Sequence, residues 1–239
     1  MESSSTVSSK SVLLGIPLRE DEGRFAHVDA RFTASLLANI STLAQAGVKI
    51  NVHQAVGPGL TLDRARNNIV KFFLEQTDCT HLFFWDCDTL LLPDAILKLL
   101  ARKLPIVSGL YLERGMLHRP IIMNLVVKDN KLVGHSFPFV HINDVPYNQL
   151  IECDVTPGGM FLTERSVFQK ITEPWFVFTG KIGEDIFFSL KAADAGYKQY
   201  VDTGVEGIHL VHHPAASERT LQEWAKSYGY KVTVPDAQH

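Results

Sequence analysis

The sequence predicts a single α/β domain over residues 11–239, with a mostly parallel central sheet, helices on both of its faces and a small antiparallel hairpin. From residue 12 to residue 111, short β-rich apolar runs alternate with helical patterns, which is typical of strands joined by crossover helices. The 239 residues are 46% apolar and 21% charged, the composition of a globular protein with a substantial core. No segment has the composition of a linker that would divide the chain in two.

The first half is expected to fold as four strands joined by three helices. Val12–Ile16 forms the first strand, which Pro17 ends. A helix follows from Asp29 to Ala46, because Asp29 can cap it and Gly47 can end it. Its expected buried stripe is Phe32, Leu36, Leu37, Ile40 and Leu43.

The strand and helix pattern then continues to residue 111. The next strands are expected at Val48–His53, His81–Trp85 and Ile106–Tyr111. The next helices are expected from a cap at Thr61 to about Gln76, and from Pro93 to about Lys103. The first of these two helices is expected to bury Leu62, Ala65, Ile69 and Phe73.

The second half of the sequence does not continue the regular alternation of strands and helices. Two β-rich runs flank Asp129-Asn130, which predicts a hairpin, and residues 134–150 are expected to be irregular. The remaining elements are expected to be a helix at Glu184–Ala195, a strand at Lys198–Val201 and a C-terminal helix that begins at Ser217.

Composition and charge exclude several classes of partner and location. The 23 Lys and Arg against 26 Asp and Glu leave a formal net charge of −3, so no nucleic-acid partner is expected. No apolar run approaches the roughly 18 residues of a membrane span, and residues 1–10 are expected to be a disordered Ser-rich tail rather than a signal peptide. Three cysteines at spacings that fit neither a disulfide framework nor a zinc knuckle favour a reducing, cytoplasmic location.

Asp86 and Asp88 form the sharpest candidate site. A chain of this composition is expected to contain about three acid-x-acid pairs by chance, so the pattern alone is not informative. The position of Asp86 and Asp88 in the sequence is what distinguishes this pair. Both residues follow a strongly apolar strand, and open α/β sheets gather ligand groups at the carboxyl ends of their strands. Carboxylates there can hold Mg²⁺ or Mn²⁺ and leave positions for phosphate oxygens. The alternative is that they merely cap the helix that begins at Pro93.

Glu184 and Asp185 lie directly before a helical pattern. Acidic residues at a helix N-terminus are favoured by the macrodipole for stability alone. The functional alternative is that Asp185 acts as a general base toward an acceptor hydroxyl. The helix terminus is then expected to hold Asp185 rigidly and to lower its pKa.

Two further groups are weaker candidates. His209, His212 and His213 lack the spacing of a helical zinc motif, and a supporting ligand to a cation already held by carboxylates fits better. In the segment 63–67, arginine can pair with phosphate in a bidentate manner. Alternatively, Arg64 and Asn67 belong only to the solvated face of an amphipathic helix.

The order of these segments resembles that of a GT-A glycosyltransferase of the family 2 type. The resemblance covers residues 12 to about 213 and comprises LLGIPLRE at the first strand, ARN at residues 65–67, the D-x-D at residues 86–88, IVSGLY, TPGGMFLTERSVF, GEDIFFSLKAADAGY and the histidine of GIHL. There is no clear Q-x-x-R-W element, so a processive synthase is not expected.

This resemblance implies a GT-A, Rossmann-like domain that transfers a hexosyl or pentosyl group from a nucleotide-diphosphate sugar, with inversion, to a hydroxyl of a glycan, protein or small molecule. It implies Asp185 as the catalytic base, with Glu184 beside it, and a Mn²⁺ or Mg²⁺ cofactor. The implied metal ligands are Asp86, Asp88, His209 and His212. The implied donor-binding residues are Pro17, Arg19, Glu20, Arg66, Asn67, Asp86 and Gly159.

Three other classes of protein are alternatives to a glycosyltransferase. A phosphatase of the haloacid dehalogenase type needs Thr four residues after the first Asp, where this chain has Leu90. A sugar nucleotidyltransferase needs a Gly-rich loop after the first strand, whereas PLREDEGRF contains one glycine. A non-catalytic protein that binds a nucleotide sugar or a glycan is compatible with the same fold.

Overall fold

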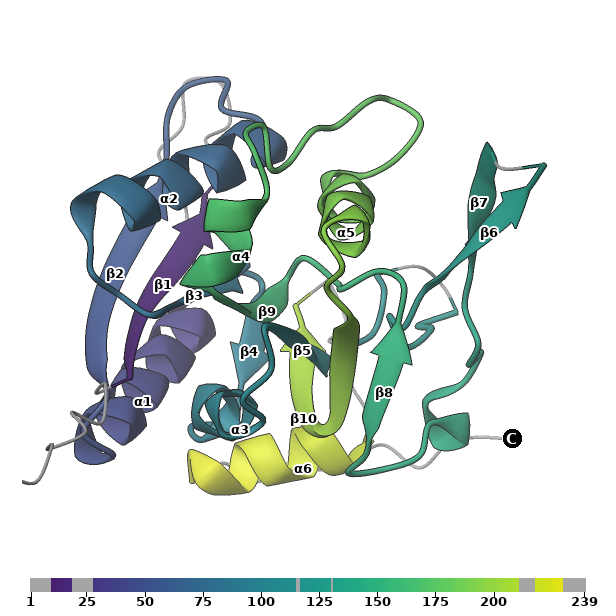
Figure 1. The fold of residues 1–239 in the computed structure, drawn as a ribbon. Coiled ribbons are helices and arrows are strands. Elements are labelled where there is room, and N and C mark those ends of the chain that lie inside the picture. The colour runs from purple at the N-terminus through teal and green to yellow at the C-terminus, as the bar shows by residue number, and fades with distance from the viewer. Residues whose placement is uncertain (1–9, 19–27, 115–116, 130, 211–217, 230–239) are drawn as a thin grey trace, which may run out of the picture.

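The computed structural model describes residues 10–18, 28–114, 117–129, 131–210 and 218–229 (Figure 1). Its strands are β1 (Ser11–Pro17), β2 (Lys49–Ala55), β3 (His81–Trp85), β4 (Thr89–Leu91), β5 (Ile106–Leu110), β6 (Asn124–Lys128), β7 (Lys131–Ser136), β8 (Leu150–Cys153), β9 (Met160–Glu164) and β10 (Gln199–His209). Its α-helices are α1 (Ala30–Gln45), α2 (Leu62–Gln76), α3 (Ala95–Ala101), α4 (Arg165–Lys170), α5 (Glu184–Asp194) and α6 (Glu218–Ser227), and a 3₁₀-helix spans Ile142–Asp144.

The main sheet confirms the predicted mixed α/β class. Its strand order is β2-β1-β3-β9-β5-β10-β4, with β8 also paired to β10. β1, β2, β3, β5 and β10 run in one direction, whereas β4, β8 and β9 run in the other. Because β9 runs antiparallel between β3 and β5, its first residue, Met160, lies opposite Trp85, the last residue of β3. The glycine-rich turn before β9 therefore meets the D-x-D motif.

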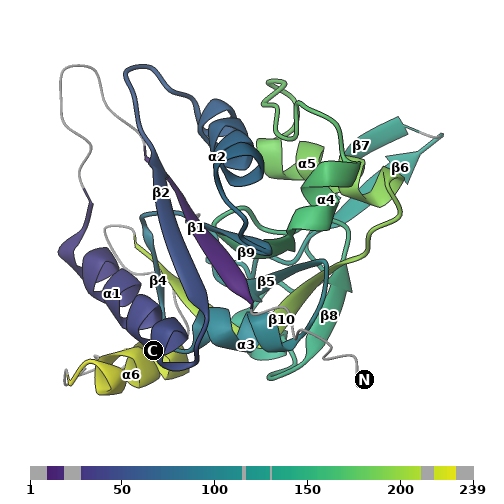
Figure 2. The same ribbon diagram turned by 60° about the vertical axis from the view of Figure 1, so that its left-hand side comes forward.

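Helices cover both faces of the sheet (Figures 1 and 2). α1, α3 and α6 pack on one face, where Leu14 and Phe83 lie in the same apolar cluster. α2, α4 and α5 pack on the other, where Leu13 and Phe84 lie in a second cluster. Alternate side chains of one strand point to opposite faces, so apolar residues at consecutive positions of β1 and β3 are all buried. This double burial explains why these strands are continuous apolar runs.

The predicted helices are confirmed, but the predicted burial of two of their leucines is wrong. Leu37 and Leu62 are exposed. In α1, the buried face instead includes Ser35, whose Oγ donates to Leu91 O at 2.8 Å, and Asn39, whose Nδ2 donates to Leu92 O at 3.0 Å. Polar residues that satisfy backbone groups beside β4 thus take positions that an apolar pattern cannot identify.

The structure contains elements that the sequence does not predict, one in the first half and the others in the second. β4, β8 and α4 have no counterpart among the predicted elements, and β10 extends well beyond Lys198–Val201. The register of β10 against β5 shifts between Asp202 and Glu206, so no simple alternation marks its full length. The hairpin at Asp129 is confirmed as β6 and β7, which form a separate two-stranded sheet (Figure 1).

The predicted ends of the chain are tested only in part. Residues 1–9 of the expected tail and Ser217, the expected start of the last helix, lie outside the described residues. Lys10 is described, and its Nζ donates to Leu100 O at 2.7 Å. Among the described helices, none is both long and apolar enough to cross a membrane.

Candidate active site

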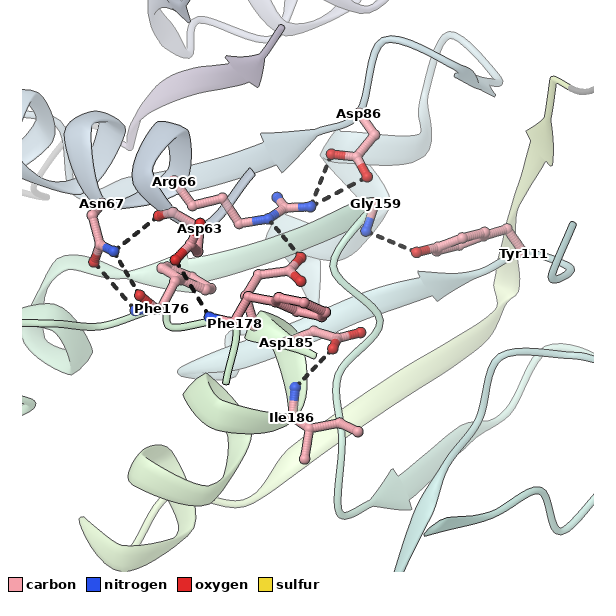
Figure 3. A network of polar contacts seen from close by, with 11 residues as sticks. Asp63, Arg66, Asn67, Asp86, Tyr111, Gly159, Phe176, Phe178, Asp185 and Ile186 are labelled. Atoms are coloured by element: carbon pink, nitrogen blue, oxygen red, sulfur yellow. Dashed lines mark hydrogen bonds and ion pairs between the residues drawn. The ribbon is translucent and has the colours of Figure 1, made fainter. Parts of the chain in front are cut away.

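Polar groups from four elements, side chains from three of them and the backbone of a glycine from the fourth, converge at the carboxyl end of β3 (Figure 3). Asp86 directly follows β3, Gly159 directly precedes β9, and Glu184 and Asp185 open α5. Arg66 reaches between them from α2 (Figure 3). The D-x-D motif and the acid pair, about 100 residues apart in the chain, therefore share one site at the strand ends, where open α/β sheets bind ligands.

Arg66 is the centre of this site, and its side chain is almost completely buried. Its Nη2 donates to both carboxylate oxygens of Asp86 at 2.9 and 3.2 Å, and its Nε donates to Glu184 Oε1 at 3.3 Å. The guanidinium lies 5.2 Å from the centre of the Phe84 ring. Its Nη1 is buried and has no hydrogen-bond partner among the described residues. One guanidinium thus joins the D-x-D motif to the acid pair and keeps N–H donors free for a ligand.

The two carboxylates of the D-x-D motif have different surroundings. Asp86 N donates to Gly159 O at 2.9 Å, and Thr89 N donates to Asp86 O at 3.0 Å, which forms a tight turn. The Asp88 carboxylate lies on the His209 side, with Oδ1 3.7 Å from His209 Nε2. Arg66 therefore neutralises the first acid of the motif, whereas the second faces the end of β10.

Asp88 and His209 fit a divalent cation. His209 Nδ1 lies 2.9 Å from Leu112 O, so it carries the ring hydrogen and leaves a lone pair on Nε2. Burial lowers the pKa of His209, which favours this neutral form. Asp88 Oδ1 is buried without a hydrogen-bond partner among the described residues. Asp88 Oδ1 and His209 Nε2 lie 3.7 Å apart, so both can bind one cation through bonds of about 2.1 Å.

The set of metal ligands implied by the resemblance is larger than the group that the structure assembles. Within the described ranges, no three His, Cys, Asp or Glu side chains gather as a metal centre. Asp86 is hydrogen-bonded to Arg66, which satisfies its carboxylate without a cation. His212 lies outside the described residues, so Asp88 and His209 are the expected ligands that the structure places together.

Gly159 packs directly against Tyr111 (Figure 3). Gly159 N donates to Tyr111 Oη at 2.8 Å, and a Cβ added to Gly159 would lie 2.7 Å from that oxygen and 3.3 Å from Asp86 Oδ2. Burial, assisted by the charge of Asp86, raises the pKa of Tyr111, so its phenol stays protonated. Glycine at this position therefore allows the turn to approach the D-x-D motif.

Gly159→Ala is expected to destabilise the protein by about 1–3 kcal/mol, because the added methyl group overpacks the contact with Tyr111. Urea denaturation measures the change, with Gly134→Ala as the control. A Cβ added to Gly134 would meet no atom within 4 Å, so the control is expected to stay within about 0.5 kcal/mol of the parent. Equal stabilities of the two variants would contradict the close contact.

The acid pair at the start of α5 has an environment that favours proton transfer. Burial raises the pKa of Asp185, although Ile186 N donates to its Oδ1 at 2.8 Å and Arg66 opposes the rise. Burial likewise raises the pKa of Glu184 against the attraction of Arg66. The expectation that the helix terminus lowers the pKa of Asp185 is therefore wrong, because loss of water outweighs the helix end. A raised pKa makes Asp185 a stronger base than an exposed aspartate.

Asp185→Asn is expected to raise the melting temperature at pH 8, because it removes a carboxylate whose charged form burial disfavours. A native pKa above the unfolded one gives stability that is present below the unfolded pKa and is lost as the pH rises through the native pKa. The difference in melting temperature between the variant and the parent is therefore expected to shrink toward pH 3.5 in a series of thermal melts. A variant that melts below the parent at pH 8 would contradict this account.

Asn67 binds the segment that leads into α5. Its Nδ2 donates to Asp63 O at 2.9 Å and to Phe176 O at 2.6 Å, and its Oδ1 accepts from the backbone N–H groups of Trp175 and Phe176. Both amide hydrogens and both oxygen lone pairs are thus used within the protein. Asp63 Oδ2 also accepts from Phe178 N at 3.3 Å. These contacts fix the chain before the acid pair, so the geometry gives Asn67 a positioning role.

The last residues to place are three that the resemblance implies as donor-binding residues and two site residues to which it gives no role. Pro17 ends β1, where it is buried and aligned with Ala55 of β2. Arg19 and Glu20 lie outside the described residues. The sequence gives no signal for Tyr111 or Arg114, which contact Gly159 and the Asp88–His209 pair respectively. No local pattern distinguishes Arg114 from a surface arginine, because its partners are far away in the chain.

Neither a family model nor a curated protein matches the chain. Among solved structures, a protein from STIV matches with a TM-score of 0.53 at 16% identity, over 84% of this chain and 86% of that chain. GalNAc-T7, crystallised with UDP, GalNAc and Mn²⁺, matches with a TM-score of 0.54 at 11% identity, over 95% of this chain. This chain spans only 45% of GalNAc-T7.

The inositol-1-phosphate CTP transferase from T. maritima matches with a TM-score of 0.47 at 14% identity, over 93% of this chain and 98% of that chain. The likeness to GalNAc-T7, whose TM-score is above 0.5, supports a GT-A-like fold for this chain. At these identities the likenesses say nothing of the reaction.

Proposed function

We propose that this protein is an inverting, family 2-like glycosyltransferase that moves a sugar from a nucleotide-diphosphate sugar to an acceptor hydroxyl. The main support is the cluster in which the buried Arg66 joins Asp86 to Glu184, with Asp185 beside it. Such a cluster brings a proton acceptor to the sheet edge where nucleotides bind.

Asp185 is the proposed general base. It removes the proton of the acceptor hydroxyl as that oxygen attacks the anomeric carbon of the donor sugar. The bond from this carbon to the diphosphate oxygen breaks in the same displacement, through an oxocarbenium-like transition state, and the configuration inverts. Glu184 stays paired with Arg66 and so holds the first turn of α5 against the D-x-D motif.

The donor is proposed to lie over Asp86 and Gly159, with the free Nη1 of Arg66 as a hydrogen-bond donor. Asp88 and His209 would hold Mn²⁺ or Mg²⁺, which when bound offsets the charge of the leaving nucleoside diphosphate. Cys79, Cys87 and Cys153 are unpaired, which supports action in a reducing compartment such as the cytoplasm. The acceptor is a glycan, a protein or a small molecule with a free hydroxyl.

A panel of nucleotide sugars incubated with Mn²⁺ tests this function through donor hydrolysis. One donor is expected to be hydrolysed, and Asp88→Asn is expected to slow this reaction at least ten-fold. Asp129→Asn makes the same chemical change on the exposed hairpin turn and is expected to have no effect.

Two results would contradict the proposed function. Release of pyrophosphate from a nucleoside triphosphate and a sugar phosphate would indicate a nucleotidyltransferase. Nucleotide-sugar binding without turnover, with or without candidate acceptors, would indicate a binding protein.

A further inference from the structure

Arg114 bridges the two residues proposed to hold the cation. Its Nη2 forms an ion pair with Asp88 Oδ2, and its Nε lies 2.8 Å from His209 Nε2. Arginine nitrogens act only as donors, so His209 Nε2 accepts this hydrogen bond. The contact from His209 Nδ1 to Leu112 O independently assigns the same tautomer. The guanidinium therefore uses the lone pair through which His209 would bind a metal ion.

Arginine and a cation cannot occupy His209 together. A neutral imidazole has a single lone pair on Nε2, which serves either the hydrogen bond or a metal bond. At Asp88, the positive guanidinium also neutralises the carboxylate that would attract the cation. Binding of a divalent cation at this pair is thus linked to departure of Arg114.

The backbone fixes the two ligands, whereas the arginine is free to move. Leu210 N donates to Asp88 O at 2.6 Å, and His209 lies opposite Thr89 in the ladder between β10 and β4. Asp88 and His209 consequently keep their relative position. The Arg114 side chain is 55% exposed, so it can turn toward water without disturbing the core.

We propose that Arg114 is an internal counter-ion that a divalent cation must displace before it binds Asp88 and His209. The inference rests on the proposed function only in using the same cation site, and its test needs neither donor nor acceptor. The exposed ion pair and one hydrogen bond weaken cation binding by about ten-fold, which corresponds to ~1.4 kcal/mol. In the metal-free protein, Arg114 keeps the Asp88–His209 pair neutralised.

Titration with Mn²⁺, followed by the electron paramagnetic resonance signal of the free ion, tests this proposal on the full chain. Arg114→Ala is expected to bind Mn²⁺ about ten-fold more tightly than the parent. Arg119→Ala is the matched control, because Arg119 is close in sequence but pairs with Glu113. The control is expected to bind Mn²⁺ as the parent does, and circular dichroism checks that each variant is folded.

Three results would overturn the proposal: equal or weaker Mn²⁺ binding by Arg114→Ala, an equal gain in Arg119→Ala, or no Mn²⁺ binding by either protein. The third result includes the case in which Asp88 and His209 form no cation site. Tighter binding by Arg114→Ala in a chain that hydrolyses no nucleotide sugar would support the counter-ion and contradict the proposed function. Equal Mn²⁺ affinity of the parent and Arg114→Ala, together with hydrolysis of a nucleotide sugar by the parent, would contradict the counter-ion and support the proposed function.

Discussion

Asp185→Asn is expected to slow glycosyl transfer by about 10²- to 10⁴-fold, the contribution usual for a general base. The amide keeps the size of the carboxylate and can still accept from Ile186 N, but it cannot take the acceptor proton. Since Asp185 is proposed to act on the acceptor, the KM for the donor is expected to change little. Steady-state transfer to an acceptor identified with the preferred donor measures both quantities.

Glu184→Gln is the matched control for this prediction. Glu184 lies beside Asp185, but its Oε1 accepts from Arg66 Nε, so its proposed role is to position the helix end. Its replacement is expected to slow transfer by less than about ten-fold, because a neutral amide oxygen can still accept this hydrogen bond. A larger loss in Glu184→Gln than in Asp185→Asn would assign the base to Glu184 instead.

Arg66→Met is expected to destabilise the protein by about 3–5 kcal/mol, the usual result of removing one partner from a buried ion pair. The Arg66 side chain is 1% exposed, and its loss leaves the carboxylates of Asp86 and Glu184 next to each other without a counter-ion. Urea denaturation measures the free energy of unfolding. Arg64→Met, on the exposed side of the same helix, is expected to stay within about 0.5 kcal/mol of the parent.

A second variant separates lost charge pairing from lost packing. Adding Asp86→Asn and Glu184→Gln to Arg66→Met removes both unpaired charges and is expected to recover most of the lost stability. If Arg66→Met unfolds at the same urea concentration as Arg64→Met, the proposed central position of Arg66 is wrong.

The strands that the sequence predicts well are those buried on both faces. His81–Trp85 is predicted with its observed bounds, because its four apolar residues, from Leu82 to Trp85, pack alternately against the two helical layers. The hairpin is predicted because a turn dipeptide separates two β-rich runs. Periodicity fails where polar residues are buried, as with Ser35 and Asn39 of α1.

The candidate site could be predicted as a set of residues but not as a set of contacts. Arg66 pairs with Glu184 across 118 positions of the chain, and no spacing rule connects such distant residues. Asp88 meets His209 only because the three-residue strand β4 pairs with β10, and so short a strand has no recognisable pattern. The pKa of Asp185 depends on how deeply α5 packs, which the motif alone does not determine.

The central claim is that the sheet edge at Asp86 and Asp88 binds the diphosphate of a nucleotide. Isothermal titration calorimetry with UDP, GDP, CDP and ADP in the presence of Mn²⁺ tests it most directly. We expect at least one of these nucleotides to bind the parent and Asp129→Asn equally, and to bind Asp88→Asn at least ten-fold more weakly. Binding of none of them, or equal binding to the parent and Asp88→Asn, would contradict the claim.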